Sequence, residues 1–378
     1  MHHQLPLRQQ GHGLTVTAEA DAGNGAPEID ALLSRLGLGP LGSLDEAASL
    51  PGRNQTCAGI TSLGNHVVVK RFRGSASDAS RRLQRSIAFE RTVGTASPRW
   101  FAAPRCAGWD EDARLMAFEF VEGARSGADL LLAAEWDDGL ARQVGLAVGE
   151  LHGIPASVGP DGSWATADRA VPALPSAELL AGLPVGVYAA CSAAELQAWS
   201  LLQHDPPLAD AIGRLLRLQD QAEMTPAHCD FRLEQLFVAA GRLYLCDWEE
   251  FRIADPARDV GSFAGEWLHY AVMTMTGSDA DAEALSQAEI VRRIAGSIER
   301  VRPRIAAFWA GYRSVRPAAG QDLAARAAAF AGWHMFDRML AIARRSARLR
   351  AVDRAAAGIG RTILLSPTGF AQTLGLEM

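Results

Sequence analysis

The chain has 378 residues, of which 48% are hydrophobic and 21% are charged, and its formal net charge is −6 at pH 7. This balance is typical of a folded globular protein, and the negative charge argues against nucleic acid as a partner. No run of about 18 apolar residues could span a membrane, and no apolar run near the start indicates a signal peptide. The five cysteines are scattered without a Cys-x-x-Cys pair, which favours the reducing cytoplasm over a disulfide framework.

The first predicted elements are a tail, a helix and a β-hairpin. Residues 1–26 are rich in Gly, Ala and polar residues without periodicity, so we expect a disordered tail. A helix is predicted from Pro27, and Gly37 ends it. Two β-prone runs then flank Gly64-Asn65, and both of these residues tolerate positive φ angles, which predicts a hairpin.

The second strand of this hairpin contains Lys70, the only lysine among 37 basic residues. Because arginine serves everywhere else, this position suggests a need for a compact ammonium group on a flexible stem. Chance placement is the plain alternative. Just before the hairpin, a turn-rich loop carries Gly52 and Asn54. Its backbone amides could approach phosphate groups closely, although such loops are most often simple turns.

A longer helix is predicted over residues 77–94, with Glu90 in its second half. Two further strands are expected near 104–109 and 115–121. Beyond them the chain is predicted to be largely helical, with long Ala- and Arg-rich helices from about Asp279 to the end.

These elements predict an α+β protein with two lobes, which the length of the chain also favours. The first lobe is a small antiparallel β-sheet with one key helix, and the second is larger and mostly helical. The predicted boundaries are 27–121 for the first lobe, 122–350 for the second and 351–378 for a C-terminal tail.

The stretch "HCDFRLEQLFVAAGRLYLCDWEEF" in the second lobe places carboxylates around a predicted hairpin. Asp230 precedes the first strand and Asp247 follows the second, so both lie at the same end, with Glu249 nearby. Oxygen ligands of this kind suit a divalent cation, and a solvated acidic loop is the alternative. A zinc site at His228-Cys229-Asp230 is disfavoured because consecutive side chains point apart.

Several motifs occur here in a fixed order: His228-x-Asp230, a polar amide at Gln235, Asp247-Trp-Glu, and "DPARD" ending at Asp259. With Lys70 upstream, this set resembles the catalytic segment of the aminoglycoside phosphotransferase and choline kinase superfamily, relatives of the protein kinases. The resemblance covers about residues 41–333. It implies a bilobal kinase-like fold and transfer of the γ-phosphoryl group of ATP, with Mg²⁺, to a hydroxyl group.

The resemblance also implies how the first lobe binds ATP. Lys70 would hold the α- and β-phosphates, steadied by Glu90 from the helix. The loop with Gly52 and Asn54 would lie over the phosphates, although its glycine-rich character is weak. The backbone from Glu119 to Val121 would contact the adenine edge.

The catalytic roles that the resemblance implies fall on the second lobe. Asp230 would orient the acceptor hydroxyl and take its proton, and Asp247 would bind Mg²⁺. Arg232 matches the position at which protein kinases carry a lysine that touches the transferred phosphate. His228 would brace the loop, and Asp259 would hold it by hydrogen bonds.

Gln235 departs from the pattern of the superfamily, which usually has asparagine as a metal ligand at this position. Glutamine offers the same carbonyl oxygen one methylene farther out, so it could still coordinate Mg²⁺ directly or through water. The number of metal ions, one or two, is left open by this departure.

The acceptor is suggested by a narrower resemblance. "HCDFRLEQLFV" together with "LYLCDWEEFRIADPARDVGSFAGEW" is similar to the phosphotransferase-like proteins of class V lanthipeptide and thioviridamide-type peptide pathways. This implies phosphorylation of Ser or Thr in a ribosomally made precursor peptide, after which a separate lyase eliminates the phosphate. Two alternatives stay open: a kinase for a small molecule such as a sugar, amino alcohol or aminoglycoside, and a non-catalytic module that binds peptide or nucleotide.

Overall fold

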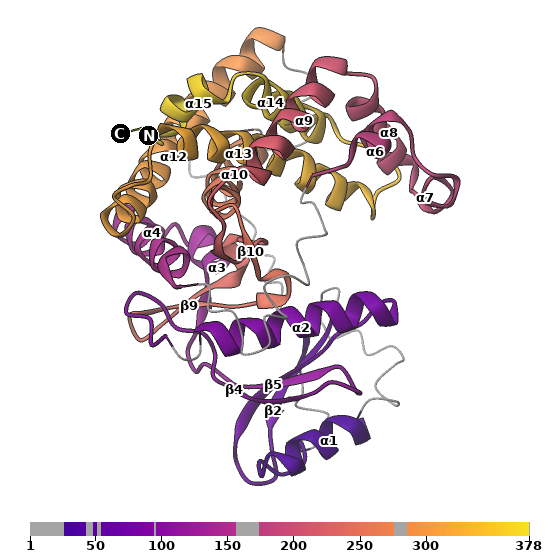
Figure 1. The fold of residues 1–378 in the computed structure, drawn as a ribbon, viewed down its shortest axis with the longest axis vertical. Coiled ribbons are helices and arrows are strands. Elements are labelled where there is room, and N and C mark those ends of the chain that lie inside the picture. The colour runs from indigo at the N-terminus through magenta and orange to yellow at the C-terminus, as the bar shows by residue number, and fades with distance from the viewer. Residues whose placement is uncertain are drawn as a thin grey trace, which may run out of the picture. The chain divides into compact units, whose positions relative to one another are not determined.

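A computed structural model describes residues 26–42, 48–50, 54–93, 96–155, 174–275 and 286–377 (Figure 1). They form two compact units. The first contains the described residues up to Leu83 together with Pro104–Val121, and the second contains Gln84–Ala103 and the chain from Glu122 onwards. The predicted tail lies outside the described residues, apart from Ala26.

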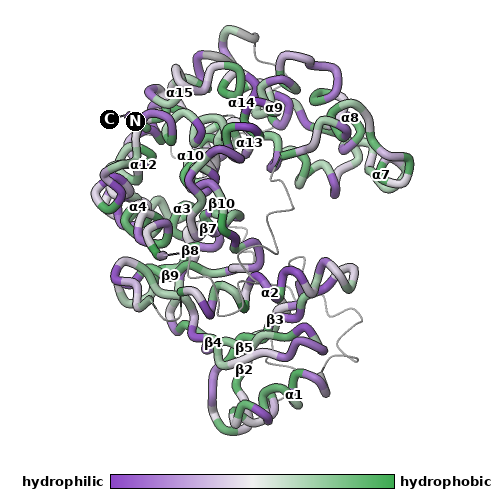
Figure 2. Tube along the Cα trace, viewed as in Figure 1, coloured by the Kyte–Doolittle hydropathy of each residue, from purple (hydrophilic) through white to green (hydrophobic). Residues whose placement is uncertain are grey.

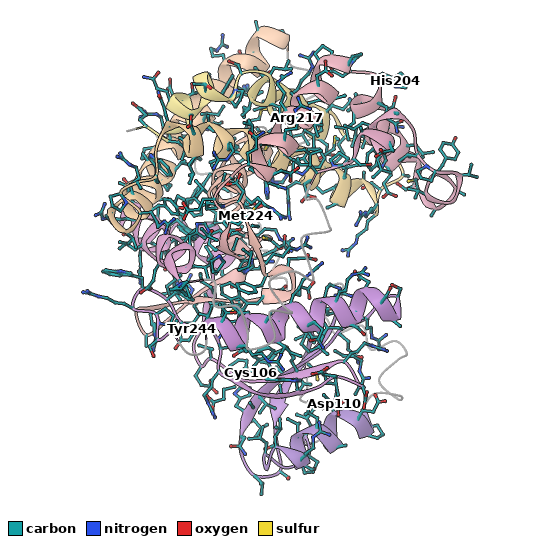
Figure 3. The ribbon with its side chains drawn as sticks, viewed as in Figure 1. Cys106, Asp110, His204, Arg217, Met224 and Tyr244 are labelled. Carbon is teal, nitrogen blue, oxygen red and sulfur yellow. The ribbon has the colours of Figure 1, made fainter. Side chains whose placement is uncertain are left out.

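The first unit is a five-stranded antiparallel sheet in the order β1-β2-β3-β5-β4. The predicted hairpin is present, with Gly64 at a φ of 80° in its turn. Cys106 and Asp110, which are labelled in Figure 3, mark the ends of β4. The strands are β1 (Ala48–Leu50), β2 (Gln55–Ile60), β3 (His66–Arg71), β4 (Cys106–Asp110) and β5 (Leu115–Glu119).

Helix α1 (Ala26–Arg35) covers one face of this sheet. Its Leu32 and Leu33 are fully buried against Val67 and Val69 of β3. Since side chains alternate across a strand, Lys70 points to the face opposite these valines. The sheet therefore keeps its lysine apart from the apolar core of the unit.

Helix α2 (Ala76–Val93) belongs to both units. It begins slightly before the predicted start, because the hydroxyl of Ser75 accepts a hydrogen bond from the backbone amide of Asp78. From Gln84 onwards the helix is part of the second unit, where Phe89 stacks on Trp248 with ring centroids 3.6 Å apart. The predicted first lobe of 27–121 therefore needs correction, because the half of α2 that carries Glu90 is packed into the second unit.

The second unit is built mainly of helices around a large apolar core. Hydrophobic and hydrophilic residues alternate along these helices, as expected for amphipathic helices packed on a core (Figure 2). In the described part of the chain, no helix is both long and apolar enough to cross a membrane. The helices are α3 (Gly127–Leu132), α4 (Asp138–Gly153), α6 (Ala177–Ala181), α7 (Val185–Ala190), α8 (Ala193–Gln203), α9 (Pro206–Asp220), α10 (Ala257–Met273), α12 (Gln287–Val315), α13 (Gln321–Ala343), α14 (Ala351–Leu365) and α15 (Pro367–Leu374).

The segment bounded as a C-terminal tail, 351–378, is helical, as the Ala- and Arg-rich pattern predicts. It forms α14 and α15, and Ile363 and Leu374 are fully buried. Gly332 of α13 and Gly360 of α14 let the two backbones approach so closely that a methyl group on either would lie within 3 Å of the other's carbonyl oxygen.

Two small sheets hold the polar segments of the second unit. Strands β6 (Arg125–Ser126), β8 (Leu236–Ala239) and β9 (Arg242–Leu245) form one, and β7 (Thr225–Ala227) pairs with β10 (Arg252–Ala254) in the other. Tyr244, which is labelled in Figure 3, lies on β9. The predicted β8–β9 hairpin is present, and both Ala240 and Gly241 in its turn have positive φ angles.

Helices α4 and α12 cross at glycines. A methyl group on Gly145 of α4 would lie 1.9 Å from the carbonyl oxygen of Phe308, and one on Gly311 of α12 would lie 2.1 Å from that of Arg142. Neither backbone could approach the other this closely if the glycines carried side chains. The crossing fixes how the C-terminal turn of α4 meets α12.

We predict that Gly145→Ala lowers the free energy of unfolding by about 1–3 kcal/mol, because the added methyl group forces the helices apart. Gly358→Ala is the control: it lies at an exposed position in α14 with no atom within 4 Å of the added group. This substitution should raise the stability by about 0.5–1 kcal/mol. Urea denaturation measures both, and equal stability of the two variants would contradict the close crossing.

Candidate active site

The carboxylate of Asp259, in the first turn of α10, is fully buried and holds the segment that precedes Asp230. One oxygen accepts the backbone N–H of His228 at 2.7 Å, and the other accepts that of Cys229 at 2.8 Å. Cys229 has a left-handed φ of 64°, which directs its N–H beside that of its neighbour. Two consecutive amides are thus bound by one side chain, and the loop is fixed at its start.

Two residues that the sequence analysis did not single out support this carboxylate. His152, at the end of α4, places Nε2 3.1 Å from Asp259, and its Nδ1 lies 3.0 Å from the hydroxyl of Tyr312 on α12. Burial alone would raise the pKa of Asp259, but the hydrogen bonds from His152 and from the backbone outweigh it and hold the pKa below its usual value. The only sequence signal was a histidine in the last turn of an amphipathic helix.

Asp230 lies directly after these anchored amides. Its Oδ2 accepts hydrogen bonds from Arg232 at 2.8 Å and from the side-chain amide of Gln235 at 3.0 Å. Its Oδ1 accepts none from any described residue. Burial raises the pKa of Asp230, and the charge of Arg232 and the hydrogen bond from Gln235 oppose this effect. One carboxylate oxygen is therefore fixed, and the other is available to accept a proton.

The loop that contains Asp230 is also held after this residue, at Leu233, by a second buried carboxylate. Glu266 of α10 accepts the N–H of Leu233 at 3.3 Å, and its other oxygen lies 2.7 Å from Nε2 of His334 on α13. Burial would raise the pKa of Glu266, yet His334 and Arg338 lower it to about 2. No pattern in the sequence indicated this cluster, because its members come from two helices far apart in the chain.

Asp247 follows β9 and has a left-handed backbone, with φ 68° and ψ 59°. The next residue, Trp248, is held by a hydrogen bond from its indole N–H to the carbonyl of Leu245 and by stacking on Phe89. His228 lies 2.9 Å from the carbonyl oxygen of Cys246, so it links the Asp230 loop to the segment of Asp247. The negative charge of Asp247 contributes to the raised pKa of Asp230. The structure thus brings the two aspartates into one polar region.

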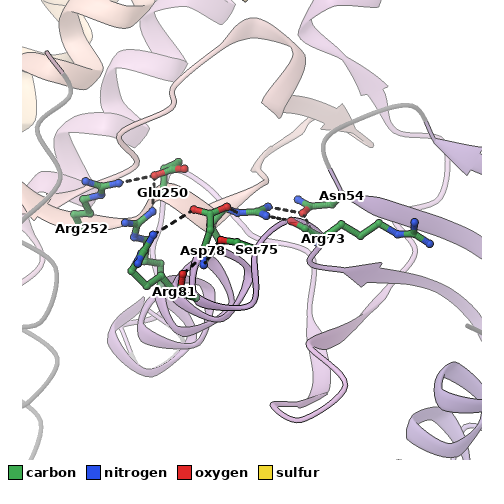
Figure 4. Close-up of polar contacts among 10 residues, drawn as sticks. Asn54, Arg73, Ser75, Asp78, Arg81, Glu250 and Arg252 are labelled. Carbon is green, nitrogen blue, oxygen red and sulfur yellow. Dashed lines mark hydrogen bonds and ion pairs between the residues drawn. The ribbon is translucent and has the colours of Figure 1, made fainter. Parts of the chain in front are cut away.

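The segment after Asp247 is also bonded to α2. Glu250 accepts hydrogen bonds from Arg85 of α2 at 2.7 Å and from Arg252 of β10 at 2.6 Å (Figure 4). Together with the stacking of Phe89, this ion pair fixes the second half of α2 beside the Asp247 segment.

In the first unit, the side chain of Asn54 has a structural contact. Its Oδ1 accepts hydrogen bonds from Arg82 and from the backbone of Arg73 (Figure 4). Arg82 is fully buried, and it also bonds the carbonyl oxygen of Arg73 and the carboxylate of Asp78. This buried arginine, which the sequence did not reveal, ties the end of the predicted phosphate loop to α2. Gly52 lies outside the described residues.

The other predicted nucleotide-binding residues of the first unit lie on β3 and β5. The ammonium group of Lys70 lies 5.3 Å from the centroid of the Phe72 ring. Glu119 is the last residue of β5 and is paired with Arg105 at the surface, and Val121 follows two residues later. Their contacts with ATP stay predictions.

Glu90 lies on the half of α2 that belongs to the second unit, whereas Lys70 belongs to the first. Their ion pair therefore stays a prediction. Burial raises the pKa of Glu90 to about 7.

A family model described as the phosphotransferase enzyme family matches residues 53–308, more than half of the chain. The chain belongs to the phosphotransferase enzyme family. This confirms the superfamily that the motifs resemble, and it makes the chain a phosphotransferase with a hydroxyl group as acceptor. No curated protein sequence is significantly similar to this chain.

Three solved structures are similar to this chain. An amicoumacin kinase in complex with AMP-PNP, Ca²⁺ and Ami matches with a TM-score of 0.53 and 14% identity, over 89% of this chain and 92% of that chain. A glucosamine kinase in complex with glucosamine, ADP and inorganic phosphate matches at 0.49 and 16%, over 91% and 86%. A macrolide 2'-phosphotransferase from Brachybacterium faecium matches at 0.46 and 15%, over 88% and 97%. The first of these likenesses confirms the predicted kinase-like α+β fold.

We predict that Asp259→Asn lowers the free energy of unfolding of this phosphotransferase by about 3–5 kcal/mol. An amide has only one accepting atom, so its NH₂ group would face one of the two backbone N–H groups. Because the pKa of Asp259 is lowered in the folded state, its stabilisation is present at neutral pH and is lost as the pH falls below about 4. Urea denaturation at pH 7 and at about pH 2, well below the pKa of a free aspartate, measures this loss. Asp210→Asn, at an exposed position of α9, should change the stability by less than about 0.5 kcal/mol. An Asp259 variant as stable as this control would contradict the anchoring role.

The raised pKa of Glu90 gives a prediction with the opposite sign. As the pH rises from 4.5, the value for the free side chain, to about 7, the folded state must ionise a half-buried carboxyl group and loses stability. The stability of Glu90→Gln relative to wild type should therefore rise over this interval. The expected rise is about 1 kcal/mol, because solvent screens part of the effect. Thermal denaturation across the pH range checks this, with the exposed Glu299→Gln as control. A Glu90 variant less stable than wild type at pH 8 would instead indicate a paired carboxylate, as the resemblance implies for Lys70 and Glu90.

Proposed function

We propose that this phosphotransferase uses ATP and Mg²⁺ to phosphorylate Ser or Thr hydroxyls of a ribosomally made precursor peptide, and that a separate lyase then eliminates the phosphate. The catalytic part of this proposal rests on the hydrogen bonds of Asp230. One of its oxygens is held by Arg232 and Gln235, and the other accepts no hydrogen bond from a described residue. A carboxylate arranged in this way can orient a hydroxyl group and take its proton.

The transfer itself needs little covalent chemistry from the protein. The acceptor oxygen forms a bond to the γ-phosphorus, the bond to the bridging oxygen breaks, ADP leaves, and the hydroxyl proton passes to Asp230. Asp247 offers a carboxylate for Mg²⁺, which neutralises phosphate charge when bound. Lys70 and Arg232 would supply further positive charge to the phosphates.

The charges around the loop disfavour a polycationic acceptor. Asp230 and Glu234 are both paired with Arg232, at 2.8 Å each. The two buried carboxylates bonded to the loop are also engaged: Glu266 by His334 and the amide of Leu233, and Asp259 by His152 and two backbone amides. Ammonium groups of an aminoglycoside would have to displace these partners, whereas the neutral hydroxyl of Ser or Thr would not. The resemblance of the Asp230 and Asp247 segments to peptide-modifying phosphotransferases supports the same choice.

A small-molecule kinase is the second candidate. A solved structure of similar fold, described as an amicoumacin kinase in complex with AMP-PNP, Ca²⁺ and Ami, aligns over most of this chain. At 14% identity this likeness supports the fold and leaves the acceptor to experiment.

The deciding experiment is intact-mass spectrometry of the precursor peptide after incubation with this protein, ATP and Mg²⁺, with and without the lyase. We expect a gain of about 80 Da per phosphate without lyase, and a net loss of about 18 Da per modified residue when lyase is added, since phosphate leaves far more readily than hydroxide. Asp230→Asn should abolish both changes, because the proton acceptor is lost.

Asp210→Asn, on the exposed face of α9, is the matched control and should behave as wild type. Phosphorylation of an amino alcohol, sugar or antibiotic, with no change in the peptide, would favour the small-molecule kinase. A biological output that survives Asp230→Asn would favour the non-catalytic binding module.

A further inference from the structure

Every polar group of Gln235 is bonded within the second unit. Its backbone N–H donates to the carbonyl of Arg232 at 3.0 Å, and its backbone carbonyl accepts from Cys246 at 2.9 Å. Its side-chain oxygen accepts the N–H of Arg232 at 3.1 Å, and its side-chain NH₂ donates to Asp230 at 3.0 Å. The residue is only 5% exposed. Gln235 therefore connects the loop of Asp230 to Cys246, the residue that precedes Asp247.

The orientation of this amide follows from its partners. A backbone N–H can only donate, and an ionised carboxylate can only accept, so the oxygen must face Arg232 and the nitrogen must face Asp230. The reversed amide would place two donors together at one end and two acceptors together at the other. The oxygen that a metal ligand would need is thus turned back into the loop.

The extra methylene of glutamine allows its side chain to reach both Arg232 and Asp230. Gln235 closes a short 3₁₀ turn, Leu233–Gln235, and its side chain folds back to an amide three residues earlier and to a carboxylate five residues earlier. An asparagine side chain in the same turn is one carbon shorter and could not keep both contacts without a shift of the backbone. Glutamine, where the superfamily usually has asparagine, thus holds the carboxylate of Asp230 in place.

We propose that Gln235 is a positioning residue that fixes the carboxylate of Asp230, and that it is not a ligand of the metal ion. By holding Oδ2, together with Arg232, it leaves Oδ1 to receive the acceptor proton. A bound metal ion would then be held by Asp247 and by the phosphates of the nucleotide, in keeping with the usual binding of Mg²⁺ through one or two carboxylates. This inference depends on the phosphotransferase activity but not on the identity of the acceptor.

The test separates metal binding from turnover. Gln235→Met keeps the buried volume and removes both side-chain hydrogen bonds, Gln235→Asn keeps the amide and shortens its reach, and Asp247→Asn serves as the metal-site reference. Calorimetry measures the binding of AMP-PNP as a function of Mg²⁺ concentration. Turnover is measured as ATP hydrolysis with water as acceptor, so that neither readout needs the peptide. Binding of AMP-PNP to wild type is established first, so failure of the kinase assignment is seen separately.

For both Gln235 variants we expect turnover to fall about 10- to 100-fold, the usual effect of losing a residue that orients an active-site group. The Mg²⁺ concentration for half-maximal AMP-PNP binding should stay within about twofold of wild type, whereas Asp247→Asn should raise it about tenfold or more. Circular dichroism confirms folding, and if the Met variant does not fold, the Asn variant alone decides. A Gln235→Asn variant with unchanged turnover, or a shift in Mg²⁺ dependence as large as that of Asp247→Asn, would overturn the proposal.

Discussion

The catalytic loop depends on one buried charge, the carboxylate of Asp259. A buried carboxylate is stable only when its oxygens receive hydrogen bonds, and here the donors are two consecutive backbone amides and His152. The amides of the loop satisfy the buried charge, and the charge in turn requires the left-handed backbone at Cys229. Asp230 is the next residue, so its position is set before its own side chain makes any contact.

A second set of contacts then determines how Asp230 presents its charge. Arg232 and Gln235 bind the same oxygen, so the negative charge on that side is matched, and the other oxygen is the one that the proposed function assigns to the acceptor proton. Glu266 holds Leu233 within the same loop and is itself held by His334. All of these bonds act within one unit, so the helical unit alone orients the carboxylate of Asp230. Under the proposed function, this orientation does not have to be formed again at each turnover.

The sequence revealed the local features well and the long-range ones poorly. Hairpins with Gly64 or Gly241 in the turn could be predicted, because alternation and turn residues are properties of a short window. The motif residues Asp230, Asp247 and Asp259 could be found by order and spacing. The partners of Asp259 could not: His152 is 107 residues away from it, and Tyr312 is 160 residues away from His152. The split of α2 between the units was also missed, because no local pattern records which unit a helix face contacts.

Gln235 shows why residue identity alone does not define a role. An amide carries both a donor and an acceptor, and its chemistry in a site depends on which end faces the ligand. The sequence fits a metal ligand and a brace equally well, and only the contacts to Arg232 and Asp230 distinguish them. The same contacts bear on the acceptor, because carboxylates that neutralise arginine within the loop are no longer available to attract a cationic substrate. Under the proposed function, selection among acceptors would then depend on shape and hydrogen bonding more than on charge.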